Sequence, residues 1–174
     1  NRANNSCRRR DVYAKYLIMA FYQLIQSQKV NASMEEVWDF ISSPKNLKEI
    51  TPDYMGFDIT SKELTDKMYP GMIIGYGVSP LFGIKTTWVT EITQVRDMSY
   101  FVDEQRIGPY SIWHHQHFIE PIEGGVLMRD IVTYQPPFGF LGAIMNRLVI
   151  QTKLKEIFAY RTEALEKRYG KFED

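Results

Sequence analysis

Apolar and polar residues alternate with a period of two through most of the middle of the chain, which predicts strands with one buried face. Short segments rich in glycine, proline or charge separate the runs and indicate turns, among them Tyr69-Pro70-Gly71, Val95-Arg96-Asp97 and Glu123-Gly124-Gly125. Because such short connections join neighbours, the last four runs are expected to form an antiparallel meander. The seven expected strands are Phe21–Val30, Phe57–Ser61, Met72–Ser79, Thr86–Gln94, Met98–Arg106, Tyr110–Ile119 and Val126–Tyr134.

Two short helices are expected after the first strand. Ser33 and Glu36 have the spacing of a capping box, and apolar residues then recur at helical intervals as far as Pro44. A second helical segment, from Lys45 to Ile50, should end before Thr51-Pro52.

One long helix is expected from about Gly139 to Tyr169, with Gly170 as its C-terminal cap. An apolar stripe along this helix can pack on the concave face of the meander. Its first turns and the preceding segment 136–140 are apolar on other sides too, which favours core packing, with a lid over a pocket mouth or a partner contact as alternatives. The stripe consists of Ala143, Ile150, Leu154, Ile157, Phe158, Leu165 and Tyr169.

Composition and charge exclude several classes of function. The 174 residues are 44% hydrophobic and 14% aromatic, which fits a globular domain. Lys plus Arg and Asp plus Glu number 21 each, so no net charge draws the protein to nucleic acid, and no apolar run predicts stable membrane insertion. Cys7 is the only cysteine, which excludes an internal disulfide and leads us to expect a cytoplasmic protein.

The first 18 residues differ from the rest of the chain. They combine an asparagine-rich start, the basic run Arg8-Arg9-Arg10 and the beginning of an apolar run from Tyr16 to Tyr22. That run is too short for a secretion signal and lacks a small-residue cleavage site close behind it. We therefore expect a flexible extension, residues 1–18, followed by one domain, residues 19–174.

The order of these elements, and several long stretches of sequence, resemble a known superfamily. The stretches are VWDFISSPKNLKEITPDYMGF, MYPGMIIGYGV, WVTEIT, FVDEQRIGPYSIWHHQHF and FGFLGAIMNRL. They resemble bacterial ligand-binding domains of the SRPBCC superfamily, also called START or Bet v 1-like, in its polyketide cyclase-like branch. The resemblance implies an α+β helix-grip fold, in which a curved antiparallel sheet of about seven strands wraps around a long C-terminal helix. Relatives bind lipids, hormones or polyketides, or act as cyclases and dehydratases, so the function has to be argued from the site.

Polar and aromatic chemistry is concentrated between Phe101 and Phe118, a stretch that holds all three histidines of the chain. Two alternating runs flank Ile107-Gly108-Pro109, which predicts a hairpin with a three-residue loop. Such a loop would pair Asp103 with Trp113, Phe101 with His115, and Ser99 with His117.

Either face of this hairpin is a candidate to line a cavity. The even-numbered face carries Tyr100, Val102 and His114, whereas the odd-numbered face carries the other two histidines. We favour the odd-numbered face, because the most distinctive letters of the resemblance fall on it. The expected ligand-binding residues are Trp88, Phe101, Asp103, Gln105, Trp113, His115, His117, Asp130 and Tyr134.

The same side chains allow a metal site as an alternative. His115 and His117 point the same way from a strand, and with Asp103 or Asp130 they would offer two nitrogens and a carboxylate. We expect instead a hydrogen-bonded network without metal, because relatives of this superfamily generally work without metal. No cofactor is expected either, since the glycines at 71, 75 and 77 do not lead into a helix.

The function that these observations favour is the binding of a small, mostly apolar ligand, similar to a lipid or a polyketide, in a cavity between sheet and helix. A cofactor-independent cyclase or dehydratase that uses histidine and aspartate for acid–base chemistry is one alternative. An interaction module without a cavity is another. Arg147 and Arg161 lie on the apolar side of the last helix and could meet a ligand carboxylate, but both are expected at the surface. A monomer or a homodimer is expected.

Overall fold

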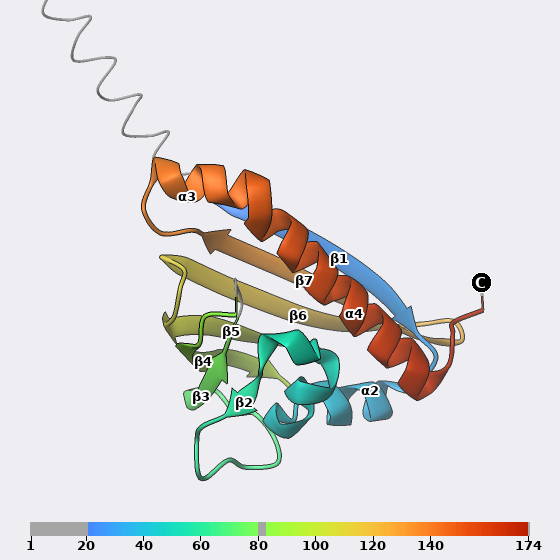
Figure 1. Cartoon of the computed structure of the whole chain (residues 1–174). Helices are drawn as coiled ribbons and strands as arrows, with labels where there is room; N and C mark the ends of the chain where they lie inside the picture. Colours follow the sequence, from blue (N-terminus) through green and yellow to red (C-terminus); the bar gives the residue numbers. More distant parts are fainter. Residues whose placement is uncertain (1–20, 80–82, 174) are drawn as a thin grey trace, which may run out of the picture.

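A computed structural model describes residues 21–79 and 83–173 of the chain (Figure 1). In this part of the chain seven strands form one antiparallel sheet with the order β1-β7-β6-β5-β4-β3-β2. The expected meander of the last four strands is confirmed from β4 to β7, β3 continues it beside β4, and β1 pairs with β7 along its whole length. The strands are β1 (Tyr22–Val30), β2 (Asp58–Ile59), β3 (Met72–Val78), β4 (Thr86–Arg96), β5 (Tyr100–Ile107), β6 (Ile112–Ile122) and β7 (Gly125–Gln135).

The sheet curves, and the C-terminal helix lies across it (Figure 1). Register shifts between Val89 and Thr90 and between Ile92 and Gln94 interrupt the pairing of β4 with β5. Such bulges bend the strand that contains them and increase its twist. In β7 every second residue is buried, so one face of the strand belongs to the core, as the period of two predicts.

The segment between β1 and β2 is mostly helical. In α2 (Met34–Ile41) the capping box is present: the Ser33 hydroxyl accepts a hydrogen bond from the Glu36 amide, and the Glu36 carboxylate accepts one from the Ser33 amide. The second helical segment is η1 (Pro44–Ile50), a 3-10 helix, and another short one follows as η2 (Asp53–Met55). The expected strand Phe57–Ser61 shortens to the two residues of β2.

The expected uniform C-terminal helix contains a change of helix type. It consists of α3 (Phe140–Met145), a π-helical turn η3 (Asn146–Ile150) and α4 (Gln151–Tyr169). The turn begins at Asn146, which is completely buried and whose Oδ1 accepts a hydrogen bond of 2.8 Å from the Tyr134 hydroxyl on β7. A buried side-chain bond of this kind cannot be recognised from helical periodicity. Gly170, with φ of 85°, ends the helix as expected.

The helix α4 joins two apolar clusters of the interior. Leu165 belongs to the larger cluster, built mainly from α2, β3 and the middle of the sheet. Leu154 and Phe158 belong to the smaller one, with Val132 and Tyr134 of β7. All the buried side chains of α4 therefore face the sheet, at the spacing expected for one helical stripe.

The register of the β5–β6 hairpin differs from the expected one. Asp103 lies opposite His115 and Phe101 lies opposite His117, so the expected pairs are wrong by two residues. The loop is longer than expected because the Gln105 side chain, and not a ladder residue, bonds the Tyr110 backbone at both its nitrogen and its oxygen. A shift of two residues keeps every side chain on its face, so the odd-numbered set stays together.

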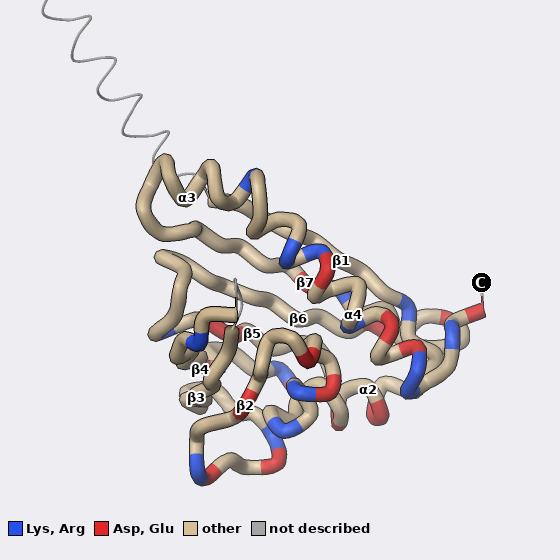
Figure 2. The backbone as a smooth tube through the Cα atoms, in the orientation of Figure 1, with Lys and Arg blue, Asp and Glu red and all other residues tan. Residues whose placement is uncertain are grey.

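The remaining expectations have mixed outcomes. The turn expected at Val95–Asp97 is wrong, because β4 continues to Arg96 and the chain turns at Met98, whose φ is 54°. The proposed extension, residues 1–18, lies outside the described residues. None of the helices in residues 21–79 and 83–173 is long and apolar enough to cross a membrane. Figure 2 shows basic and acidic residues interspersed along α4 and the segment from α2 to η2.

Two adjacent isoleucines of β3 test the assignment of sheet faces. Ile74 is fully buried, whereas Ile73 is 51% exposed. We expect Ile74→Ala to lower the free energy of unfolding by about 2–5 kcal/mol, because it removes buried methyl groups and leaves a void. Ile73→Ala should cost less than about 1 kcal/mol, the scale of strand propensity alone. Urea denaturation measures both values, and equal losses would contradict the assignment.

Candidate functional site

A partly enclosed cavity of about 170 Å³ lies between the sheet, the 3-10 segment and α4. Its lining is mostly apolar and comes from every layer of the fold. The sheet contributes Tyr76, Trp88, Ile92, Phe101 and Trp113, and α4 contributes Leu154, Ile157 and Phe158. Because these side chains come from strands and helices far apart in the sequence, the fold itself encloses the space.

One wall of the cavity is a cluster of aromatic rings. Trp88 and Trp113 meet edge to face with ring centroids 5.1 Å apart, and Tyr110 lies 5.0 Å from Trp113. The indole nitrogen of Trp88 donates a hydrogen bond of 3.0 Å to Thr90 Oγ1. The cluster therefore presents rigid apolar surface with little unsatisfied polarity at Trp88.

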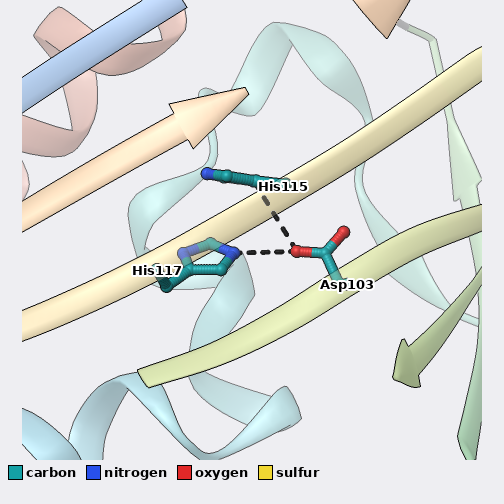
Figure 3. A group of neighbouring side chains, drawn as sticks. All are labelled: Asp103, His115 and His117. Atoms are coloured by element: carbon teal, nitrogen blue, oxygen red, sulfur yellow. Dashed lines mark hydrogen bonds and ion pairs between the residues drawn. The ribbon is translucent and has the colours of Figure 1, made fainter. Parts of the chain in front are cut away.

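Another wall is a polar network that crosses three strands and reaches α4. His117 places Nε2 at 2.7 Å from Asp103 Oδ2 and Nδ1 at 2.9 Å from Asp130 Oδ1. His115 places Nε2 at 2.9 Å from the same Asp130 oxygen, and its Nδ1 at 3.6 Å from Asp103. Arg161 of α4 donates to Asp130 from Nη1, also at 2.9 Å. Figure 3 shows both imidazole rings facing Asp103 from the same side of β6.

The strand register explains how these groups meet. Asp103 on β5 lies directly opposite His115 on β6, and Asp130 on β7 lies directly opposite His117. The two imidazole rings, two residues apart on one face of β6, have centroids 3.7 Å apart, and Phe101 stacks on His117 at 4.0 Å. Ring stacking therefore holds the two imidazoles in place in addition to their hydrogen bonds.

The hydrogen bonds decide where the protons lie. A carboxylate only accepts, so a histidine with both nitrogens bonded to carboxylates carries a proton on each, as His117 does. Burial opposes this charge, but the bonds to Asp103 and Asp130 outweigh burial and raise the pKa of His117. Burial, with the positive charge of His117, lowers the pKa of His115 to about 4, so His115 is neutral.

Both carboxylates of the network are ionised. Burial alone would raise the pKa of Asp130, but Arg161 and the two histidines hold that pKa well below its usual value. The pKa of Asp103 is likewise lowered against burial, by its bond to His117 and by the neighbouring charges. Two carboxylates, one guanidinium and one imidazolium sum to no net charge, which is what an interior position requires.

Three of these groups also have the composition of a metal site. Asp103, His115 and His117 offer ligand atoms that all lie within 4.8 Å of one another. However, the 2.7 Å between His117 Nε2 and Asp103 Oδ2 is a hydrogen-bond length with a proton between the atoms. A cation would have to displace that proton and tolerate the nearby charge of Arg161.

The structure brings together most of the residues that we expected from the sequence. Asp130 completes the network behind the lining, whereas Gln105 closes the hairpin loop and Tyr134 bonds Asn146. The expected residues that line the cavity are Trp88, Phe101, Asp103, Trp113, His115 and His117.

Two expectations about arginine and the apolar helix end are wrong. Arg161 is 8% exposed and bonded to Asp130, so it is not a surface residue. Its position between Phe158 and Leu165 on the buried stripe is visible in the sequence, but the stripe alone does not reveal the partner that allows burial. The start of the C-terminal helix is exposed instead of packed into the core, and the residues concerned do not line the cavity as a lid would. They are Phe138, Phe140, Leu141, Ile144 and Leu148.

Comparisons with known proteins agree with this architecture. The family described as polyketide cyclase/dehydrase and lipid transport matches residues 30–158. A protein of Arthrobacter aurescens has a similar structure, with a TM-score of 0.64 and 14% identity over 86% of this chain and 92% of that one. Protein TTHA0849 of Thermus thermophilus is also similar, with a TM-score of 0.63 and 17% identity over 85% of this chain and 97% of that one. For protein Ms6760 of Mycobacterium smegmatis the TM-score is 0.62 and the identity 17%, over 84% of this chain and 89% of that one. No curated protein matches the chain in sequence.

The two histidines should give stability a maximum near pH 6.5, the ordinary histidine pKa. Because the pKa of His115 falls to about 4 on folding, its contribution is lost as pH decreases from 6.5 to 4, on the order of 3 kcal/mol. Because the pKa of His117 rises on folding, its contribution is complete below 6.5 and is lost as pH rises through the folded value.

Urea denaturation between pH 4 and pH 9 measures both effects. His115→Gln should flatten the acid side of the profile, and His117→Gln the alkaline side. His114→Gln is the matched control, because His114 lies on the opposite face of β6 and pairs with Glu104 at 3.2 Å. A flat wild-type profile from pH 5 to pH 8 would contradict the assigned proton positions.

Proposed function

The chain belongs to the polyketide cyclase/dehydrase and lipid transport family, and on that premise we propose that it binds a small, mostly apolar ligand in the cavity between the sheet and α4. The observation that carries the proposal is the cavity itself, about 170 Å³ with a largely apolar lining and one polar wall. Small-molecule sites typically combine an apolar enclosure with a few fixed polar groups.

The position of the network supports binding. Its charged groups compensate one another, so they can border an apolar cavity and still offer hydrogen bonds to part of a ligand. The aromatic wall of Trp88, Tyr110 and Trp113 supplies rigid surface that loses little conformational entropy when a ligand binds. An interaction module, by contrast, would need no such space inside.

Binding can be tested with N-phenyl-1-naphthylamine, a neutral probe whose fluorescence rises in apolar surroundings. We expect saturable binding of one probe per chain, and we expect Trp113→Ala to weaken it about tenfold through loss of aromatic contact. Phe118→Ala is the matched control, because Phe118 lies on the opposite face of β6, near Tyr100 and Arg129. Absence of saturable binding, or equal effects of the two variants, would refute the proposal.

A cofactor-independent cyclase or dehydratase is a second candidate. One observation favours it: a protonated His117 and an ionised Asp103, 2.7 Å apart, border the cavity and could exchange protons with a bound molecule. If the network is catalytic, His117→Gln should abolish turnover of a polyketide-like substrate and leave probe binding within about threefold. If the protein only binds, neither the wild type nor the variant will turn the substrate over.

A further inference from the structure

One buried residue of the cavity wall carries a hydroxyl without a partner. Tyr76 lies on β3, is 4% exposed and lines the cavity. Its ring packs against Phe57, with centroids 4.7 Å apart, so its orientation is fixed. No residue in the ranges 21–79 and 83–173 forms a hydrogen bond with its hydroxyl. Polar groups of buried residues usually have a partner, so a hydroxyl that has none in the protein and borders a cavity is available to whatever the cavity holds.

Two other polar side chains around the cavity are already engaged. Asn46 donates to the Phe40 carbonyl at 3.0 Å, and Thr51 donates to the Leu47 carbonyl at 2.7 Å. Ser43, Tyr110 and Trp113 also carry a hydroxyl or an indole N–H without a hydrogen bond among the described residues, but these three residues are only partly buried. Tyr76 is therefore a buried residue of the cavity wall whose hydroxyl lacks an acceptor among the described residues.

The charges near Tyr76 restrict what that acceptor can be. Burial, and then the negative charge of Asp103, raise the pKa of Tyr76, so the hydroxyl keeps its proton and donates. A ligand carboxylate at this place would lie near the charge of Asp103. The positive groups of the network are already paired, His117 with Asp103 and Arg161 Nη1 with Asp130, whereas Arg161 Nε has no partner among the described residues. An uncharged oxygen is not repelled by Asp103 and needs no compensating positive charge.

We propose that the Tyr76 hydroxyl donates a hydrogen bond to an uncharged oxygen, a carbonyl or a hydroxyl, on an otherwise apolar ligand, and that Asp103 disfavours carboxylates at the same place. The inference rests on the proposed binding function and specifies its ligand class: ketones, quinones, phenols or alcohols on an apolar framework, and not fatty acids. Tyr76 then determines specificity, while the aromatic wall supplies contact area.

Three naphthalenes of similar shape separate these classes: 2-acetylnaphthalene carries a ketone, 2-ethylnaphthalene carries no oxygen, and 2-naphthoate carries a carboxylate. Each is titrated against bound N-phenyl-1-naphthylamine, which gives its affinity by displacement. For the wild type we expect 2-naphthoate to bind at least tenfold more weakly than 2-acetylnaphthalene.

Tyr76→Phe is the decisive variant, since it removes one oxygen and leaves the ring in place. It should weaken the binding of 2-acetylnaphthalene about three- to tenfold, the range for one hydrogen bond. The affinity for 2-ethylnaphthalene should change less than about twofold. The melting temperature of the free protein should stay the same or rise, because the lost hydroxyl had no partner. If Tyr76 had only a structural role, the variant would lower the melting temperature and would not distinguish the ketone from the hydrocarbon. Tyr69→Phe, at a tyrosine that is 52% exposed, is the matched control and should change none of these values.

The outcomes separate this inference from the function on which it rests. If the probe binds but Tyr76→Phe affects the ketone and the hydrocarbon equally, or if 2-naphthoate binds more tightly than the ketone, the assignment of Tyr76 is refuted and apolar binding stands. If the probe does not bind the wild type, the proposed function is refuted as well.

Discussion

The hydrogen bonds that meet at Asp130 Oδ1 are the interaction on which the rest of the site depends. That one oxygen accepts from His115, His117 and Arg161, and so joins two neighbouring strands to the helix that crosses them. The third strand joins through Asp103 and His117. Removing one partner would leave a buried charge uncompensated, which is among the most destabilising changes a protein interior can undergo.

This network also explains why the interior contains a cavity with a polar wall. A helix held to a sheet by a guanidinium and a carboxylate meets it at one fixed point, and the apolar clusters pack on either side of that point. Between them the side chains of the curved sheet do not fill the space. The polar wall therefore lies beside apolar surface without contributing net charge, which suits a ligand that is mostly apolar and uncharged.

The family assignment and the geometry of the site carry different kinds of information. The family and the similar structures establish how strands and helix are arranged. We propose that a few side chains of the cavity wall, such as Tyr76, Asp103 and Trp113, select the ligand, and their roles do not follow from the fold. The unpartnered hydroxyl of Tyr76 is informative for this reason, because a fold needs no such group for its stability.

The elements of the fold could be predicted from the sequence because they depend on local patterns. A period of two identifies strands, the Ser33–Glu36 box identifies a helix start, and Gly170 identifies a helix end. The sharing of a face is also local, since side chains alternate along a strand. This is why the odd-numbered residues of the hairpin were grouped correctly although the register was wrong by two.

Only the tertiary structure decided which groups interact. The register depends on the Gln105 side chain bonding the loop at Tyr110, which no alternation pattern encodes. Arg161 is buried because Asp130, 31 residues earlier, supplies the opposite charge, and an arginine on an apolar stripe looks the same in sequence with or without such a partner. Whether the hydroxyl of Tyr76 has a partner depends on all the side chains around it, which come from distant segments. Sequence periodicity therefore determined the elements and their faces, whereas partners, protons and the cavity arose from contacts between distant segments.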